Sequence, residues 1–199
     1  MMDNLADFFL TPDPFQSFRD WADAAKAKGD SHDQFILASV SDQQPNARVL
    51  LLKELESKGA VFFTNYSSIK GKELNRNPNV SLVFWWAKLG RQVRIQGAVE
   101  KISDAASEKY FHSREKASQI ASHISKQSSI LKDRKELEDK FLAAQAEFKD
   151  SPVPRPKDWG GYLVKPSAWE FFLYRDHRLN DRFEFTLSAG AWTWQRLSP

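Results

Sequence analysis

The spacing of apolar and polar residues predicts a protein built mainly from antiparallel β-strands. Short runs rich in Val, Ile, Leu and Phe alternate with turns, the first of them at 42–46 and 56–59. In the first half of the chain, strands are expected at residues 35–40, 47–53, 61–64, 80–86 and 92–102. In the second half, strands are expected at residues 161–164, 169–174, 182–187 and 192–197, with a hairpin turn at 188–190.

Helical periodicity is confined to three parts of the chain. Asp13-Pro14 is a typical helix start, and the apolar residues that follow lie on one helical face until Gly29. A short helix is expected at Ile69–Arg76, after a serine cap. The remaining helices are expected at residues 103–113, 118–125 and 131–148.

These elements together predict an α+β fold, mainly antiparallel β, with a helical insert at 103–150 between two β halves. At this length the simplest organisation is a single domain over residues 1–199, with residues 1–12 as a flexible leader. One strand has a polar face that is available to a ligand. On it Val93, Ile95 and Val99 alternate with Gln92, Arg94 and Gln96.

The composition argues against several classes of partner and site. The 29 Lys and Arg against 26 Asp and Glu give only +3, too little to indicate a nucleic-acid partner. The chain has no cysteine, and its four histidines lack metal-ligand spacing, so we expect no metal site. The acidic first residues and the lack of an apolar run of about 18 residues argue against a secretory signal or a membrane span, and favour the cytoplasm.

Aromatic residues are abundant, at 13% of the chain, with seven tryptophans. They could form flat surfaces that a planar ligand or a second subunit covers, or they could simply be core and dimer interface.

Because Gly-rich phosphate loops are missing, any phosphate must be held by side chains, and basic clusters are the candidates. Arg48 and Lys53 occupy opposite faces and ends of one strand, or are mere flanking charges. Lys70 lies at the start of the short helix, where free backbone N–H groups favour an anion.

A further cluster combines three donors to phosphate. Tyr110, Arg114 and Ser118 fall at i, i+4 and i+8, so an unbroken helix would present them on one face. Arg and Ser also occur on helix surfaces by chance. Near the end of the chain, Arg178 and Arg182 flank Asn180-Asp181 between two strands, and could form a plain surface ion-pair cluster.

About ten short motifs follow one another from about Asp13 to the last residue. They are Arg48-Val-Leu-Leu-Leu-Lys53, Phe63-Thr64-Asn65, Ser68-Ile-Lys70, Arg91-Gln92-Val93, Tyr110-Phe-His-Ser-Arg114-Glu-Lys-Ala-Ser118-Gln119, Ser125-Lys-Gln127-Ser128-Ser129, Pro154-Arg-Pro, Trp159-Gly160-Gly161, Arg178-Leu-Asn-Asp-Arg182 and Arg196-Leu-Ser-Pro199. In this order and spacing the chain closely resembles the pyridoxamine (pyridoxine) 5'-phosphate oxidase family.

The resemblance implies an FMN-binding split β-barrel, a homodimer with two FMN sites at the subunit interface. The implied reaction oxidises pyridoxamine or pyridoxine 5'-phosphate with O2, giving pyridoxal 5'-phosphate and hydrogen peroxide. The implied cofactor-binding residues are Arg48, Lys53, Phe63, Thr64, Ile69, Lys70, Gln92, Gln127, Ser128, Phe172 and Arg182. The implied substrate-binding residues are Lys53, Tyr110, Arg114, Ser118, Arg178 and Asn180, of which Arg178 and Asn180 lie over the reacting ring as the catalytic pair.

Four positions depart from the family pattern. Ile69 replaces an arginine, Phe63 a frequent tyrosine and Phe172 a tryptophan, all on the cofactor side, while Asn180 replaces a histidine on the substrate side. Two alternatives stay open at this point. One is a related flavin oxidase with another ring substrate, as in the phenazine pathway, and the other is a non-catalytic protein that binds FMN or pyridoxal phosphate.

Overall fold

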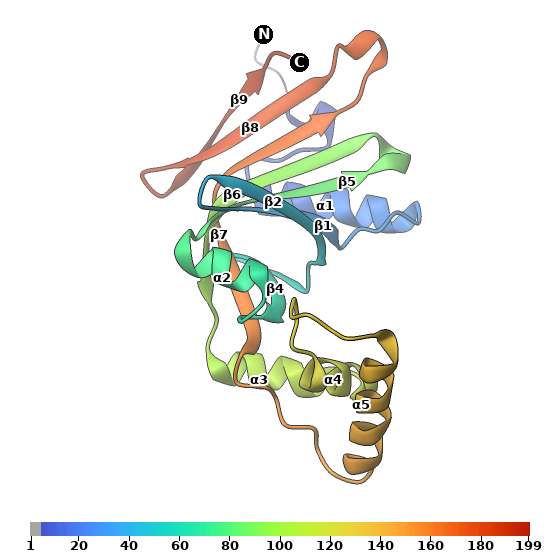
Figure 1. The fold of residues 1–199 in the computed structure, drawn as a ribbon. Coiled ribbons are helices and arrows are strands. Elements are labelled where there is room, and N and C mark those ends of the chain that lie inside the picture. Colours follow the sequence, from blue (N-terminus) through green and yellow to red (C-terminus); the bar gives the residue numbers. More distant parts are fainter. Residues whose placement is uncertain (1–4) are drawn as a thin grey trace.

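Strands dominate the computed structural model, which describes residues 5–199 (Figure 1). The nine strands of these residues form one sheet, in which every pairing is antiparallel. The strands are β1 (Gln34–Ser41), β2 (Gln44–Leu51), β3 (Glu54–Glu56), β4 (Gly59–Asn65), β5 (Asn79–Trp86), β6 (Arg91–Lys101), β7 (Trp159–Leu173), β8 (Asp181–Ser188) and β9 (Ala191–Leu197).

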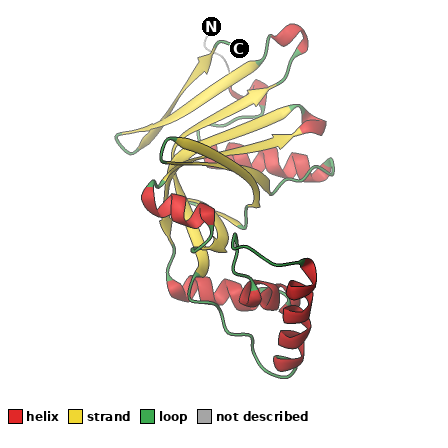
Figure 2. Ribbon diagram, viewed as in Figure 1, coloured by secondary structure: helices red, strands yellow, loops and turns green. Residues whose placement is uncertain are grey.

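The sheet divides along β7. Its main path runs β2-β1-β5-β6-β7-β4-β3, and β8 and β9 branch off from β7. Residues 159–164 of β7 pair with β4, and residues 168–173 pair with β8, while β6 pairs along nearly the whole strand. Figure 2 shows the two branches diverging, with the helices of residues 104–147 at the end of the molecule where β7 begins.

The α+β class with mainly antiparallel strands is confirmed, but the interruption expected in β7 is wrong. The sequence suggests separate strands at 161–164 and 169–174. Between them lies Pro166, which lacks an N–H for the ladder. Opposite Pro166, β6 has a register shift between Gln96 and Gly97. A Cβ at position 97 would lie 2.1 Å from the carbonyl oxygen of Lys165, so only glycine permits the bulge.

Two expected turns also differ. The turn at 42–46 tightens to Asp42 and Gln43, so β2 begins earlier, and residues 54–56 form the short strand β3 beside the turn at 57–58. Strand β2 ends at Leu51, and Lys53 therefore lies just beyond it.

The N-terminal segment packs on the sheet. Helix α1 (Pro14–Ala27) is capped by the Asp13 carboxylate and buries Phe18 and Trp21 in the main core. Before it, Leu5 and Leu10 are also buried in that core. Part of the leader expected at 1–12 thus packs on the sheet through Leu5 and Leu10, and residues 1–4 lie outside the described part.

The other helices frame the candidate site. Helix α2 (Ile69–Arg76) begins at a Ser68 cap, as expected. Between β6 and β7 lie α3 (Asp104–Ser113), α4 (Lys116–Ile124) and α5 (Arg134–Glu147). These three have their own small core, which includes Phe111, Ile120 and Trp159. Among residues 5–199 no helix is long and apolar enough to cross a membrane.

Candidate active site

A cavity of about 440 Å³ lies where the sheet meets the helical insert. One wall of the cavity comes from β2, β4 and the first residue of β7. The opposite wall comes from α3, α4 and the residues between and after these helices. It is lined by Val49, Leu50, Leu51, Lys53, Phe63, Thr64, Asn65, Tyr110, Arg114, Ala121, Ser122, Ser125, Gln127 and Trp159. Six of these residues were singled out from the sequence, although they come from four separate segments of the chain.

Three aromatic rings form a stack in this cavity. The Phe63 ring lies 3.8 Å from the Tyr110 ring and 5.4 Å from the Trp159 ring, nearly parallel to both. The Arg114 guanidinium lies over the Trp159 ring at 4.8 Å, a cation–π contact. Burial raises the pKa of Tyr110 despite the nearby Arg114 charge, so this phenol keeps its proton and can donate a hydrogen bond.

The helix is broken within the Tyr110–Ser118 segment, in line with the separate helices expected at 103–113 and 118–125, so the condition for one shared helical face is not met. Helix α3 ends at Ser113, Arg114 has extended backbone angles (φ −80°, ψ 155°), and α4 begins at Lys116. The break is stabilised from outside the segment, because the Gln119 side chain donates to the carbonyl oxygen of Arg114 at 2.7 Å.

The break changes the role of Ser118. Arg114 donates to the backbone carbonyl of Ser118 at 2.8 Å and to the hydroxyl of Ser122 at 3.0 Å. The Ser122 and Ser125 side chains line the cavity, further along the same segment. The structure thus brings Tyr110 and Arg114 together at the cavity, and it adds Ser122 and Ser125, which lie outside the motif that ends at Gln119.

A buried lysine lies next to this cavity. The Lys70 ammonium donates to Thr64 Oγ1 at 3.1 Å and to Gln127 Oε1 at 2.9 Å, and Ser68 Oγ lies 3.5 Å away. Burial lowers the pKa of Lys70, as does the Arg48 charge, while Glu73 raises it. A desolvated cation whose hydrogen-bond partners are neutral oxygens favours an anionic ligand.

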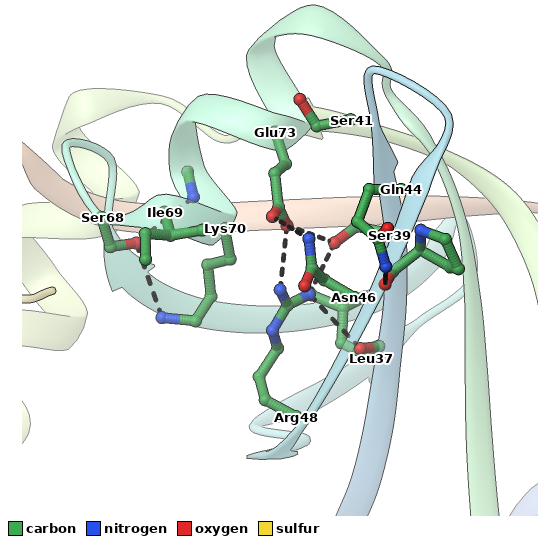
Figure 3. A network of polar contacts seen from close by, with 12 residues as sticks. Leu37, Ser39, Ser41, Gln44, Asn46, Arg48, Ser68, Ile69, Lys70 and Glu73 are labelled. Atoms are coloured by element: carbon green, nitrogen blue, oxygen red, sulfur yellow. Dashed lines mark hydrogen bonds and ion pairs between the residues drawn. The ribbon is translucent and has the colours of Figure 1, made fainter.

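Arg48 belongs to a second polar network, on the side of α2 that faces β1 and β2 (Figure 3). Its guanidinium donates to Glu73 Oε2 at 2.9 Å and to Ser39 Oγ. Asn46 donates to the other Glu73 oxygen at 2.7 Å. Glu73 is buried, and no motif in the sequence pointed to it.

Two more of the expected cofactor-binding residues, Ile69 and Ser128, meet where α2 begins. The backbone N–H of Ile69 faces the Ser128 hydroxyl at 3.4 Å, and Ser128 has a positive φ of 71°. Both residues line a second cavity of about 360 Å³, together with Lys72 and Lys126. The Ile69 side chain is 57% exposed, so the arginine that it replaces in the family pattern would reach solvent or a ligand.

Three further expected residues form a row across the other half of the sheet. Strand register pairs Gln92 of β6 with Phe172 of β7, and Phe172 with Arg182 of β8. All three side chains are half-buried, on one face. Next to Gln92 in the same row is Trp85 of β5, which is 47% exposed.

Arg178 and Asn180 lie in the loop between β7 and β8. The Asn180 side chain accepts a hydrogen bond from the backbone N–H of Arg175 at 2.9 Å, which fixes this loop. His177 and Arg178 both have positive φ angles, 58° and 61°, which is costly for residues other than glycine. Arg178 is exposed, so its charge is directed to the outside of this chain.

The expected site residues therefore fall into two groups, at opposite ends of β7. Trp159 begins this strand beside the cavity, whereas Phe172 lies 13 residues later, as much as about 40 Å along an extended strand. In Figure 1 the helices of the insert lie at one end of the molecule, and β8 and β9 lie at the other. Within one chain, the second group therefore lies away from the cavity that the first group lines.

Comparison with known proteins gives the class of protein that such a fold and cavity define. The model of the family described as "Pyridoxamine 5'-phosphate oxidase" matches residues 22–147, and that of the "Pyridoxine 5'-phosphate oxidase C-terminal dimerisation region" matches residues 159–199. The protein is an oxidoreductase, and the chain belongs to the pyridoxamine 5'-phosphate oxidase family.

Curated relatives agree over the full length. A pyridoxine/pyridoxamine 5'-phosphate oxidase from Nostoc sp. is 43% identical, with 100% of this chain and 94% of the relative covered. The chloroplastic oxidase 1 of Arabidopsis thaliana is 41% identical over 94% of this chain and 37% of its own length. Among solved structures, PhzG from Burkholderia lata 383 superimposes with a TM-score of 0.90 at 24% identity, covering 95% of this chain and 94% of its own. This similarity to PhzG shows a shared fold.

Proposed function

We propose that this protein is an FMN-dependent oxidase that converts pyridoxamine and pyridoxine 5'-phosphate into pyridoxal 5'-phosphate, with O2 as the electron acceptor and hydrogen peroxide as the second product. The observation that carries the proposal is the cavity in which Arg114, Tyr110 and Lys53 converge. A guanidinium, a phenol and an ammonium are suited to a phosphate dianion, and a ring substrate without phosphate has no use for them. A cytoplasmic location stays a prediction from the sequence.

The residues around Lys70 fit FMN. The ammonium is buried against neutral oxygens, so a phosphate would supply the missing anion, and the first backbone N–H groups of α2 lie beside it. Arg48 approaches from β2, and Gln127 and Ser128 approach from the segment after α4. FMN, when bound, supplies the two-electron redox chemistry that the side chains of this protein lack.

The chain's own residues then bind and orient the substrate. Arg114 is held by Ser118, Ser122 and the Trp159 ring, so its planar group is fixed before the substrate phosphate arrives. Tyr110 stays protonated and donates a second hydrogen bond.

The catalytic pair Arg178 and Asn180 would come from a second subunit. Since the two groups of site residues lie at opposite ends of β7, a homodimer can bring the loop of one chain to the cavity of the other. The match of residues 159–199 to a dimerisation region supports this arrangement, because the region contains both Arg178 and Asn180. O2 needs no binding group in this account.

Replacing Asn180 by histidine should speed up the enzyme. An imidazole can be cationic near neutral pH and can attract the substrate's ring oxygen or phosphate, whereas the amide is neutral. Because Arg178 keeps its permanent charge, wild-type turnover should be weakened rather than absent. We expect kcat/KM for pyridoxamine 5'-phosphate to rise about three- to thirtyfold in Asn180→His, from steady-state kinetics.

The pH dependence separates two causes of that gain. If charge is the cause, the gain grows below the imidazole pKa, and if shape is the cause it does not change with pH. An unchanged or lower kcat/KM in Asn180→His would contradict the gain expected from a histidine at position 180.

A turnover assay tests the proposed function. Purified protein is loaded with FMN and mixed with pyridoxamine 5'-phosphate under air, and the aldehyde product, oxygen uptake and peroxide are measured together. The proposal predicts equal amounts of aldehyde and peroxide. Protein that holds FMN but turns over neither phosphorylated substrate would be the non-catalytic alternative, and turnover of a phosphate-free ring alone would be the phenazine-type alternative.

A further inference from the structure

Glu73 is an acid in a place where anions are expected to bind. Its side chain is 5% exposed and accepts hydrogen bonds from Ser39 at 2.6 Å, Asn46 at 2.7 Å and Arg48 at 2.9 Å. Three donors from β1 and β2 thus converge on one carboxylate of α2 (Figure 3). A carboxylate beside a phosphate site repels the ligand, so its presence needs a compensating role.

We propose that Glu73 is a positioning residue for cofactor binding, which fixes the Arg48 guanidinium in the orientation that receives the FMN phosphate. The inference rests on the proposed function, since it takes FMN as the ligand. Glu73 does not touch the ligand itself, and it acts through Arg48.

The geometry around Arg48 supports this role. One terminal nitrogen of the guanidinium donates to Glu73, and the other donates to Ser39 Oγ, which itself donates to the same Glu73 oxygen. This triangle fixes the plane of the guanidinium from one side. A guanidinium has five N–H groups in a rigid fork. One terminal nitrogen also lies 3.5 Å from the carbonyl oxygen of Leu37, and the other donors remain for a ligand. Its side chain is 21% exposed, and thus still accessible.

The charges around α2 give a second reason. Arg48 and Lys70 are close enough that the Arg48 charge lowers the pKa of Lys70, while Glu73 opposes that effect. Without ligand, two desolvated cations would repel each other and move apart. Glu73 keeps both near their binding positions, so that little reorganisation is needed when FMN binds.

Removing the negative charge of Glu73 is expected to weaken FMN binding, which is the opposite of what charge alone predicts. Simple electrostatics says that neutralising an acid beside a phosphate site tightens binding. If Glu73 orients Arg48, Glu73→Gln should instead weaken it, because the amide presents an N–H to one of the donors that now meet an oxygen.

The experiment titrates FMN into apoprotein and follows flavin fluorescence. We expect Kd to rise about 10- to 100-fold in Glu73→Gln and in Arg48→Gln. In the double variant, Kd should stay within about twofold of Arg48→Gln alone, because Glu73 acts through Arg48. Ser39→Ala keeps the carboxylate and removes one side of the triangle, and should raise Kd about three- to tenfold.

Asp42→Asn is the matched control, since Asp42 is an exposed acid in the turn between β1 and β2 that pairs with Arg76 of α2. Its Kd should equal that of wild type, and apoprotein melting temperatures show whether each variant folds. The positioning role is overturned if Glu73→Gln binds FMN as tightly as wild type or more tightly. It is also overturned if the Glu73→Gln change raises Kd equally in the wild-type and Arg48→Gln backgrounds. If the Glu73→Gln protein does not fold, an unchanged Kd in Ser39→Ala overturns the role. Wild-type apoprotein that binds no FMN would instead overturn the proposed function itself.

Discussion

Replacing Arg114 by alanine is expected to lower kcat/KM for pyridoxamine 5'-phosphate about 10- to 100-fold while FMN binding stays unchanged. The change removes a charged donor from the cavity, which typically costs about 1.5 to 3 kcal/mol. Arg114 lies over Trp159 and contacts Ser122, so it belongs to the wall of the substrate cavity and not to the Lys70 cluster. Steady-state kinetics and an FMN titration on the same preparation measure both effects.

Two comparisons make the Arg114 result specific. Turnover of unphosphorylated pyridoxamine should change far less, because that substrate lacks the group that Arg114 binds. Arg134→Ala, which removes an exposed arginine of α5 paired with Glu138, should leave both quantities unchanged. If Arg114→Ala lost FMN and kept its affinity for the phosphorylated substrate, the assignment of this cavity would be wrong.

Replacing Lys70 by methionine is expected to weaken FMN binding by about 10- to 100-fold or more, without destabilising the apoprotein. Methionine has a similar length and no charge, so the change removes the phosphate partner together with the cost of burying an ammonium. Burial lowers the pKa of Lys70, because desolvation destabilises the charged ammonium when no ligand is bound. FMN titration and thermal unfolding of the apoprotein check the two parts.

Lys135→Met is the control for Lys70, because Lys135 is an exposed lysine that pairs with Asp139 on α5. It should bind FMN like wild type. Unaltered FMN affinity in Lys70→Met would remove the main support for placing the cofactor phosphate at the start of α2.

Local signals in the sequence were sufficient for most of the fold. The Asp13 and Ser68 caps located α1 and α2, and the alternation of apolar residues in β6 matched its buried face. What could not be predicted depends on contacts between distant segments. The continuity of β7 past Pro166, for example, needs the bulge at Gly97 of β6.

The candidate site likewise contains residues that local motifs indicate and residues whose role depends on distant contacts. Motifs identified Lys70, Tyr110 and Arg114 because their residue types suit phosphate. They gave no signal for Glu73, whose role depends on partners in β1 and β2. They also could not show that Arg178 lies far from the cavity in one chain, since that separation follows from the length of β7.

Mixing two impaired variants tests most directly whether two chains build each active site. Arg114→Ala and Arg178→Ala are each expected to keep about a tenth or less of the wild-type kcat/KM, but a dimer with one chain of each retains one site that has both arginines. Co-expression with two affinity tags, followed by an assay of the unfractionated mixture, should therefore restore about a quarter of wild-type activity, since about half of the dimers are mixed. Activity that stays at the mean of the two variants would contradict the shared site.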